Sequence, residues 1–204
     1  MSETIVLYGF GDNDRSGKVR WLARELGLAI EERPVAFGAQ REGPYLALNP
    51  YGHIPTVVFR GETLIESTAA CHLIAEAHDA PKLWIGPGEP GRRDYLTWLA
   101  IFGETLESRL VETALGKAGI LPPAFAELHG ERLAFKLGVA AARLPAEGYL
   151  AGGRFTLADI VAGYSLRLAV RAGLIAREAT EPYLGRLVAR PAAAEARFFG
   201  ALGG

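Results

Sequence analysis

The first 80 residues alternate between strand-like and helix-like patterns of apolar positions. Residues 4–8 form a β-branched and aromatic run that ends at Gly9, which predicts a strand. Apolar residues then recur with helical spacing from Val19 to Leu26 and stop at Gly27, which predicts an amphipathic helix. Residues 29–35 predict a second strand, and it should run parallel to the first because a helix connects the two.

A hairpin and a helix follow an irregular stretch. Residues 56–60 and 62–65 flank the single Gly61, which predicts two antiparallel strands joined by a tight turn. A helix is expected from Ser67 to about residue 78. The order βαβ followed by ββα predicts a first domain of the α+β class, over residues 1–79.

The rest of the chain predicts a second, all-helical domain. Residues 79–91 contain three prolines and three glycines, which neither a helix nor a central strand tolerates. We therefore expect a linker over residues 80–91 and a helical domain over residues 92–204. Apolar positions with helical spacing recur at residues 96–110, 133–144 and 157–168. Thr156 and Asp159 form a capping box, and Pro182 and Pro191 should begin two short helices.

Composition excludes several classes of protein. The 204 residues are 50% apolar and carry 22 basic and 23 acidic side chains, so a nucleic-acid partner is not expected. The single Cys71 cannot form an internal disulfide. No uncharged run has the length of a membrane span and no leader is expected, so we predict a soluble, cytoplasmic protein. The four histidines lack ligand-like spacing, and no metal site is expected.

Two glycine patterns resemble nucleotide-binding motifs, but the residues within and around them do not suit a bound phosphate. The pattern that begins at Gly9 lies between a strand and a helix, but its sixth position is Asp14, which would repel a pyrophosphate. Residues 86–91 match G-x-G-x-x-G within the proline-rich linker, where no strand precedes them and the prolines remove amide donors. Nucleotide binding is therefore rejected.

Residues 49–67 carry the remaining candidate chemistry. Pro55 immediately precedes a strand, and a cis Ile54–Pro55 bond would expose the backbone N–H and C=O of Ile54 to an extended peptide. Glu66 and Ser67 stand where the hairpin meets a helix N-terminus. Amides and a hydroxyl at that place favour a bound carboxylate, and Glu66 can accept from an ammonium group.

Six short motifs give the chain a resemblance to a known family. They are residues 7–9 (LYG), 18–21 (KVRW), 25–27 (ELG), 49–55 (NPYGHIP), 66–69 (ESTA) and 155–159 (FTLAD). In this order and spacing they resemble the cytosolic glutathione transferases over essentially the whole chain, in particular a serine- or asparagine-type bacterial member. The resemblance implies a thioredoxin-like first domain, an all-helical second domain, a homodimer, a role in detoxification, and glutathione as co-substrate.

The same resemblance implies a glutathione site along the Ile54–Pro55 edge. Ile54 would hold the cysteinyl part through its backbone, with Pro55 beside it. Glu66 and Ser67 would hold the γ-glutamyl end, and His53 would reach the glycyl carboxylate.

The motifs offer two candidates for the residue that faces the glutathione sulfur. Counting back from Lys18 puts Asn13 where serine-type members have their catalytic serine. Ser16 is the only hydroxyl of this loop, and it could equally begin the helix. Arg15 should favour a nearby thiolate and contact glutathione, whereas Asp12 and Asp14 should disfavour a thiolate unless they point away.

The mechanism follows from thiol chemistry. A cysteine thiol has a pKa of about 8.5, and only the thiolate attacks, so the site must lower that pKa. The electrophile is expected against an apolar wall formed by Phe10, Trp98 and Phe102. Two alternatives to conjugation stay open: a glutathione-dependent disulfide oxidoreductase or isomerase on the same fold, and a glutathione-binding protein without catalysis.

Overall fold

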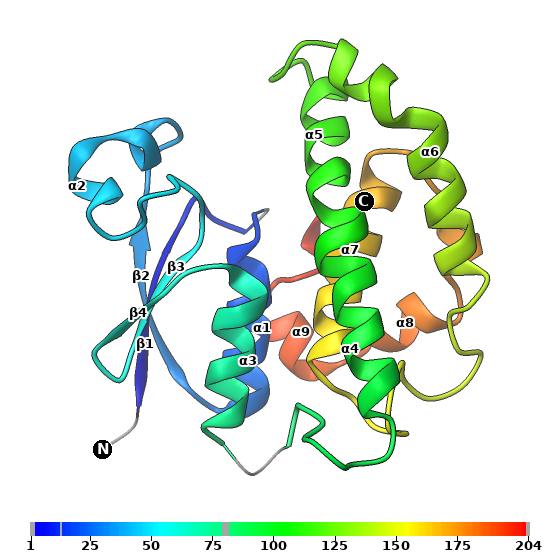
Figure 1. The fold of residues 1–204 in the computed structure, drawn as a ribbon, viewed down its shortest axis with the longest axis horizontal. Coiled ribbons are helices and arrows are strands. Elements are labelled where there is room, and N and C mark those ends of the chain that lie inside the picture. Colours follow the sequence, from blue (N-terminus) through cyan, green and yellow to red (C-terminus); the bar gives the residue numbers. More distant parts are fainter. Residues whose placement is uncertain (1–2, 13, 79–81, 203–204) are drawn as a thin grey trace. The chain divides into compact units, whose positions relative to one another are not determined.

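The computed structural model describes residues 3–12, 14–78 and 82–202, and it divides the chain into two compact units (Figure 1). The first unit comprises Met1–Trp84 and Arg190–Gly200, and the second comprises Ile85–Ala189 and Ala201–Gly204. Over the described ranges, no helix combines the length and the apolar character needed to cross a membrane.

A four-stranded mixed sheet forms the centre of the first unit. Its strands are β1 (Thr4–Gly9), β2 (Ala29–Pro34), β3 (Thr56–Phe59) and β4 (Glu62–Leu64), in the spatial order β2-β1-β3-β4. β1 is parallel to β2 and antiparallel to β3, and β3 is antiparallel to β4. The predicted parallel pair and hairpin are therefore confirmed.

Two helices cover one face of this sheet, and a shorter segment lies on the other (Figure 1). Ile5 and Leu7 alternate along β1 onto the buried face, which packs under α1 (Ser16–Leu26) and α3 (Ser67–Glu76). Gly27 ends α1 in the left-handed region, at φ 67°, as a C-terminal glycine should. The stretch that looked irregular in sequence contains a 3₁₀ turn, η1 (Ala39–Arg41), and a short helix, α2 (Gly43–Leu46).

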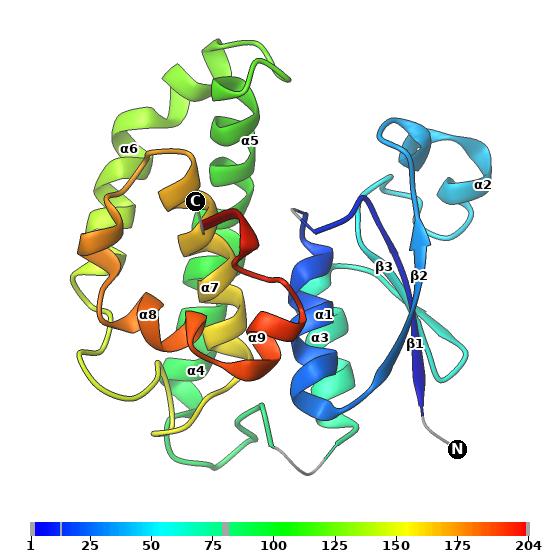
Figure 2. The ribbon, with the colours of Figure 1, turned by 180° about the vertical axis from the view of Figure 1, so that it is seen from behind.

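Residues 190–200, which the sequence division assigned to the helical domain, pack in the first unit. Figure 2 shows α9 (Pro191–Glu195) beside α1. The Trp21 ring lies 4.7 Å from the ring of Phe198. Arg190 donates to both carboxylate oxygens of Glu25, each at 2.7 Å, and Trp21 Nε1 donates to the same carboxylate at 2.8 Å. An aromatic contact and a shared carboxylate thus hold this segment on α1.

The second unit is helical, as predicted. Its elements are α4 (Arg92–Ala100), a π-helical segment η2 (Ile101–Leu106), α5 (Glu107–Lys117), α6 (Ala124–Ala141), α7 (Leu157–Arg171), η3 (Arg177–Thr180) and α8 (Tyr183–Val188), and a last 3₁₀ turn, η4 (Gly200–Leu202), straddles the boundary between the units. α7 is almost wholly buried. The predicted capping box is present, and Asp159 also accepts from the Leu150 amide at 3.0 Å and the Tyr183 hydroxyl at 2.8 Å.

The apolar stripe predicted for residues 96–110 is partly wrong. Leu96 is 45% exposed, whereas Tyr95, Phe102 and Leu106 are fully buried. A π-helical turn contains more residues than an α-helical turn, so it shifts the face that the following residues present. Ser165 on α7 donates to the Phe102 carbonyl at 2.9 Å and so satisfies a carbonyl of the widened turn.

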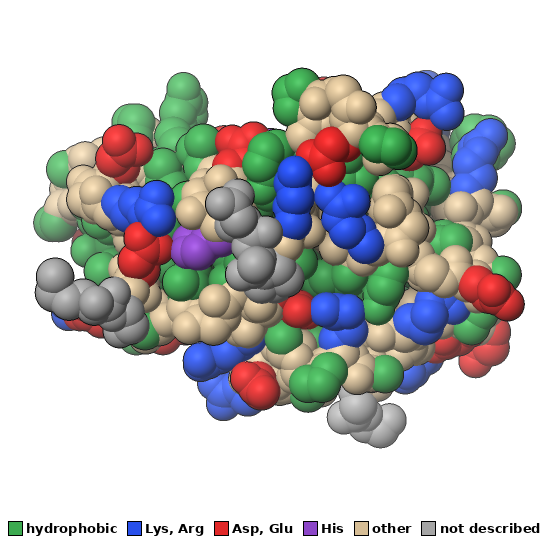
Figure 3. Space-filling model, turned by 90° about the horizontal axis from the view of Figure 1, so that it is seen from below, with side chains coloured by type: hydrophobic (Ala, Val, Ile, Leu, Met, Phe, Trp, Pro, Cys, Tyr) green, Lys and Arg blue, Asp and Glu red, His purple; other side chains and the backbone are tan. Residues whose placement is uncertain are grey.

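Charged side chains of both signs are interspersed on the face drawn in Figure 3. Ion pairs within the described residues include Arg60 with Glu3, at 2.6 Å, and Arg33 with Glu31. Among the side chains coloured there, none of the charged groups forms an extended region of one sign. This arrangement agrees with the net charge of −1 and provides no strong field on that face to collect a polyanion.

Candidate functional site

Three segments of the first unit meet at one end of its sheet. The antiparallel register pairs Tyr8 with Thr56 and Val57 with Leu64. The carboxyl ends of β1 and β4 therefore lie beside the amino end of β3. This brings together the β1–α1 loop, residues 53–55 before β3, and residues 66–67 after β4.

The segment before β3 is held from behind by two polar side chains. The His53 carbonyl accepts from the Tyr45 hydroxyl at 2.8 Å and from Asn49 Nδ2 at 3.0 Å. Burial raises the pKa of Tyr45, so its phenol stays neutral and can donate. The Ile54–Pro55 bond is cis, the form considered from the sequence for this position. Within the described residues the backbone N–H and C=O of Ile54 have no partner, which leaves both available to an extended ligand.

Glu66 and Ser67 lie across from this segment. Glu66 adopts φ 61°, an uncommon conformation for a residue with a side chain, and directly precedes α3. Its Oε1 atom is 3.9 Å from His53 Nδ1, and the two side chains are 70% and 68% exposed. Ser67 is the buried first residue of α3. The structure thus brings together His53, Ile54, Pro55, Glu66 and Ser67, all five predicted from sequence.

The Asp14 carboxylate points into the backbone of the β1–α1 loop. Its Oδ2 atom accepts from the amides of Phe10 (2.6 Å) and Gly11 (3.1 Å), and its Oδ1 atom accepts from the Ser16 amide (2.5 Å). The exposed Asp12 accepts from Arg197 at 3.3 Å. The first catalytic candidate, Asn13, lies outside the described residues.

The second catalytic candidate, Ser16, is fully buried. Its Oγ atom lies against Gly9, so closely that a side-chain carbon at Gly9 would collide with it. Within the described parts of the chain this hydroxyl has no hydrogen-bond partner. The hydroxyl therefore faces the interior under β1.

Two arginines lie near the site. Arg15 is half-buried immediately before α1. Arg41, on η1, is exposed, and its Cγ atom is 3.5 Å from where a Cβ at Gly52 would stand. No ion pair engages Arg41 in the described ranges. Sequence reasoning missed Arg41 because the stretch that carries it has no periodicity. The signal for Arg41 comes from the structure, where this cation lies next to the loop that supplies His53.

The three aromatic residues predicted for the electrophile have different surroundings. Phe10, in the first unit, is 37% exposed, and its ring lies 5.5 Å from that of Phe37. In the second unit, the half-buried Trp98 stacks on Phe102 at 5.5 Å with an interplanar angle of 19°. Phe102 itself is fully buried, so it supports Trp98 from behind.

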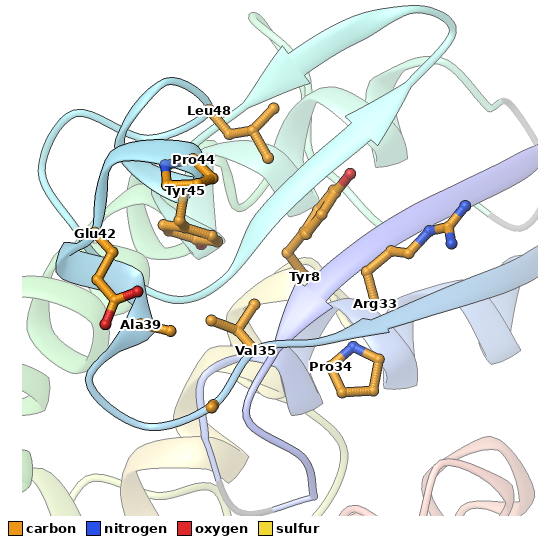
Figure 4. A pocket seen from close by; sticks show the side chains of 10 residues that line it. Tyr8, Arg33, Pro34, Val35, Ala39, Glu42, Pro44, Tyr45 and Leu48 are labelled. Atoms are coloured by element: carbon orange, nitrogen blue, oxygen red, sulfur yellow. The ribbon is translucent and has the colours of Figure 1, made fainter.

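A separate hollow lies on the opposite face of the sheet, between β1, β2 and the α2 segment (Figure 4). Its volume is about 480 Å³, and none of its lining side chains is a predicted glutathione contact. Tyr8 lines it, with its ring 6.3 Å from that of Tyr45. The side chain of Tyr8 thus points to the sheet face opposite the one that carries Ser16 and α1. Across the described residues, no cluster of His, Cys, Asp or Glu is arranged to hold a metal ion.

Comparison of the chain with known proteins identifies its family. Residues 3–76 match the model of the glutathione S-transferase N-terminal domain. Glutathione S-transferase 3 of Zea mays is 33% identical over 165 residues, which is 76% of this chain and 73% of the maize protein. The chain belongs to the glutathione S-transferase family. It is thereby an enzyme of the transferase class, with a thioredoxin-like domain that precedes a helical domain.

Other members and structures agree with this assignment to the glutathione S-transferases. A relative from Arabidopsis thaliana is 31% identical over 67% of each chain. The structure of glutathione S-transferase III in its apo form superposes with a TM-score of 0.78 at 29% identity, covering 95% of both chains. A glutathione transferase from Phanerochaete chrysosporium, solved with oxidized glutathione, gives a TM-score of 0.82 at 23% identity, over 95% and 94% of the two chains. The last similarity shows the fold alone.

Proposed function

We propose that this glutathione S-transferase binds glutathione at the end of its sheet, lowers the pKa of the glutathione thiol and adds the thiolate to a small apolar electrophile. With an aryl halide, the thiol proton passes to solvent, a sulfur–carbon bond forms, and halide leaves with the bonding electron pair. The observation that carries the proposal is the meeting of His53, Ile54 and Glu66 at one edge, in a chain of this family.

Each end of glutathione has a complementary group at this site. The α-ammonium of the γ-glutamyl part would pair with Glu66, and its carboxylate would meet Ser67 and the first amides of α3. The backbone of Ile54, which has no partner among the described residues, would bind the cysteinyl part as a neighbouring strand does. His53 would reach the glycyl carboxylate, and we add Arg41 as a second cation for that carboxylate. Arg15 would stand near the sulfur.

We assign the contact with sulfur to Asn13 rather than to Ser16. The burial of the Ser16 hydroxyl under Gly9 supports this choice, and so does the position of Asn13 in the motif. One amide donor, together with the positive end of α1, would lower the thiol pKa by about one to two units. The chain would thus be an asparagine-type member of the family.

The remaining parts of the proposal concern the second substrate and the assembly. Along the sequence, residues 1–79 would form the glutathione-binding domain, residues 80–91 the linker and residues 92–204 the helical domain, except that residues 190–200 complete the first unit. Phe10 and Trp98, the latter backed by Phe102, would contact the electrophile. We propose a cytoplasmic homodimer that acts in detoxification, and light scattering on the purified protein would test the dimer.

A direct experiment tests the chemistry. Glutathione binding is measured by calorimetry, the pKa of the bound thiol by ultraviolet difference titration, and conjugation with a chlorodinitrobenzene. We expect binding, a thiol pKa below about 8.5, and conjugation. Binding with an unshifted thiol pKa and no conjugation would indicate a glutathione-binding protein without catalysis. Exchange through a protein thiol is disfavoured, because the sole cysteine, Cys71, is buried in α3.

A further inference from the structure

We propose that Asp14 is a positioning residue for the glutathione thiol, because its carboxylate binds backbone amides on either side of itself in the loop whose sequence carries Asn13. Among the described residues, the amides of Phe10 and Gly11, which precede Asn13 in the chain, and of Ser16, which follows it, donate to this carboxylate. The proposal rests on the proposed function, since it concerns the residue assigned to the sulfur. The sequence predicts that this carboxylate disfavours a thiolate unless it points away, and here it points into the backbone of the loop.

The hydrogen bonds of Asp14 close the loop in a way that no neutral side chain of its size can reproduce. An ionised carboxylate accepts through both oxygens, and such charge-assisted bonds are shorter and stronger than neutral ones. Here one oxygen serves the strand side of the loop and the other serves the first residue of α1. The distances, 2.6 Å to the Phe10 amide and 2.5 Å to the Ser16 amide, agree with this.

The Arg20 side chain holds the same loop through a further hydrogen bond. Arg20 Nη1 donates to the Gly11 carbonyl at 2.7 Å, while Arg20 Nε and Nη2 bind both oxygens of Glu32 at 2.6 and 3.0 Å. Gly11 is thus held at its amide by Asp14 and at its carbonyl by Arg20. Its φ of 140° lies in the region that favours glycine. The loop before Asn13 is therefore fixed at both polar groups of one residue.

The electrostatic cost of this carboxylate to a nearby thiolate is reduced by its own partners. The amide dipoles of Phe10, Gly11 and Ser16 point at the Asp14 oxygens and partly neutralise the negative charge of the carboxylate. That negative charge would otherwise raise the pKa of a nearby thiol. Asp12 differs, because its carboxylate has an exposed partner in Arg197, whose side chain is 75% exposed. The two carboxylates of one loop thus form a matched pair for experiment, one built into the backbone and one on the surface.

The test compares Asp14→Asn with Asp12→Asn. Asparagine has the shape of aspartate but one acceptor oxygen, so one side of the loop loses its partner. In Asp14→Asn we expect the pKa of the bound thiol to rise by about one unit and kcat at neutral pH to fall about tenfold, recovering above the raised pKa. We expect glutathione affinity to change less than about twofold. Asp12→Asn removes the same charge and should leave the thiol pKa and the rate as in the wild type.

Two results would overturn the proposal. A lower thiol pKa and a faster rate in Asp14→Asn would show that the carboxylate acts through repulsion. A fall in thermal stability with an unchanged thiol pKa and pH–rate profile would show a purely structural role.

Hydrogen exchange tests the hydrogen bonds from the loop amides to Asp14 without any ligand or reaction. We expect the amides of Phe10, Gly11 and Ser16 to exchange slowly in the wild type and in Asp12→Asn, and faster in Asp14→Asn. Fast exchange of these amides in the wild type would refute their retention by Asp14, even if no glutathione binds. Absence of glutathione binding with slow exchange would instead refute the proposed function, and with it the role toward the thiol.

Discussion

Replacing Ser16 by alanine separates two interpretations of the loop that carries Asn13. If the buried hydroxyl under Gly9 has no role toward sulfur, the pKa of the bound glutathione thiol should not change in Ser16→Ala. The fold should become more stable. A buried hydroxyl without a partner costs about 1–3 kcal/mol, and the methyl group of alanine keeps most of the remaining packing. We expect the free energy of unfolding to rise by about 1 kcal/mol.

Asn13→Ala is the matched comparison. Loss of its amide donor should raise the pKa of the bound thiol by about one unit, which lowers the conjugation rate about tenfold below that pKa. The assay is the ultraviolet titration of thiolate in wild type and both variants, with the free energy of unfolding taken from urea denaturation. If Ser16→Ala raised the thiol pKa while Asn13→Ala left it unchanged, the assignment would be reversed.

The contact between Ser16 and Gly9 offers an independent check. Gly9→Ala should lower the free energy of unfolding by about 1–3 kcal/mol, because the new methyl group collides with the Ser16 hydroxyl. In the double variant part of that loss should return, since the hydroxyl is gone. A double-mutant cycle measures this coupling, and purely additive effects would show that the two side chains do not meet.

Further predictions concern the ligand and the two cores. Glu66→Gln should weaken glutathione binding about ten- to hundredfold in calorimetry, whereas the exposed Glu62→Gln should not. Asp159→Ala should cost about 4 kcal/mol in urea denaturation, because buried amide and hydroxyl donors lose their acceptor. Burial raises the pKa of the Asp159 carboxyl above 3.8, so the folded state binds this proton more tightly than the unfolded state does. The free energy of unfolding of the wild type relative to Asp159→Asn should therefore be greatest below pH 3.8 and should fall as the pH rises through the folded-state pKa. A rise with pH instead would contradict this argument. Phe198→Ala should cost about 3–5 kcal/mol, with the exposed Phe135→Ala as a control near zero.

Local patterns predicted most of the fold because each rule acts over a few residues. Gly27 ends α1, Gly61 turns the hairpin, and Thr156 with Asp159 caps α7, all as expected. The π-helical segment after Ala100 was not predictable, because its shift depends on how Phe102 packs within the helical unit. The α2 segment was missed because four residues are too few to show a period.

The candidate site was predictable where a residue type is tied to a turn or a helix end. Glu66 and Ser67 could be located from the hairpin and the helix that follows. The orientation of Asp14 could not, because a carboxylate in a loop can face solvent or backbone and the composition around it is the same. The burial of Ser16 depends on the approach of Gly9 from a neighbouring element, which spacing along one chain does not report.

The return of residues 190–200 to the first unit sets an order for the folding of a nascent chain. A ribosome completes the sheet and α1 first, then the whole helical unit, and only afterwards the segment that carries Phe198. Until then the indole of Trp21 and the carboxylate of Glu25 have no cover on that side of α1. A fragment cut after Trp84 would retain every strand yet expose this aromatic surface permanently. The glutathione-binding half is therefore not a separable module, and fusing residues 190–200 behind such a fragment would be needed to rebuild it.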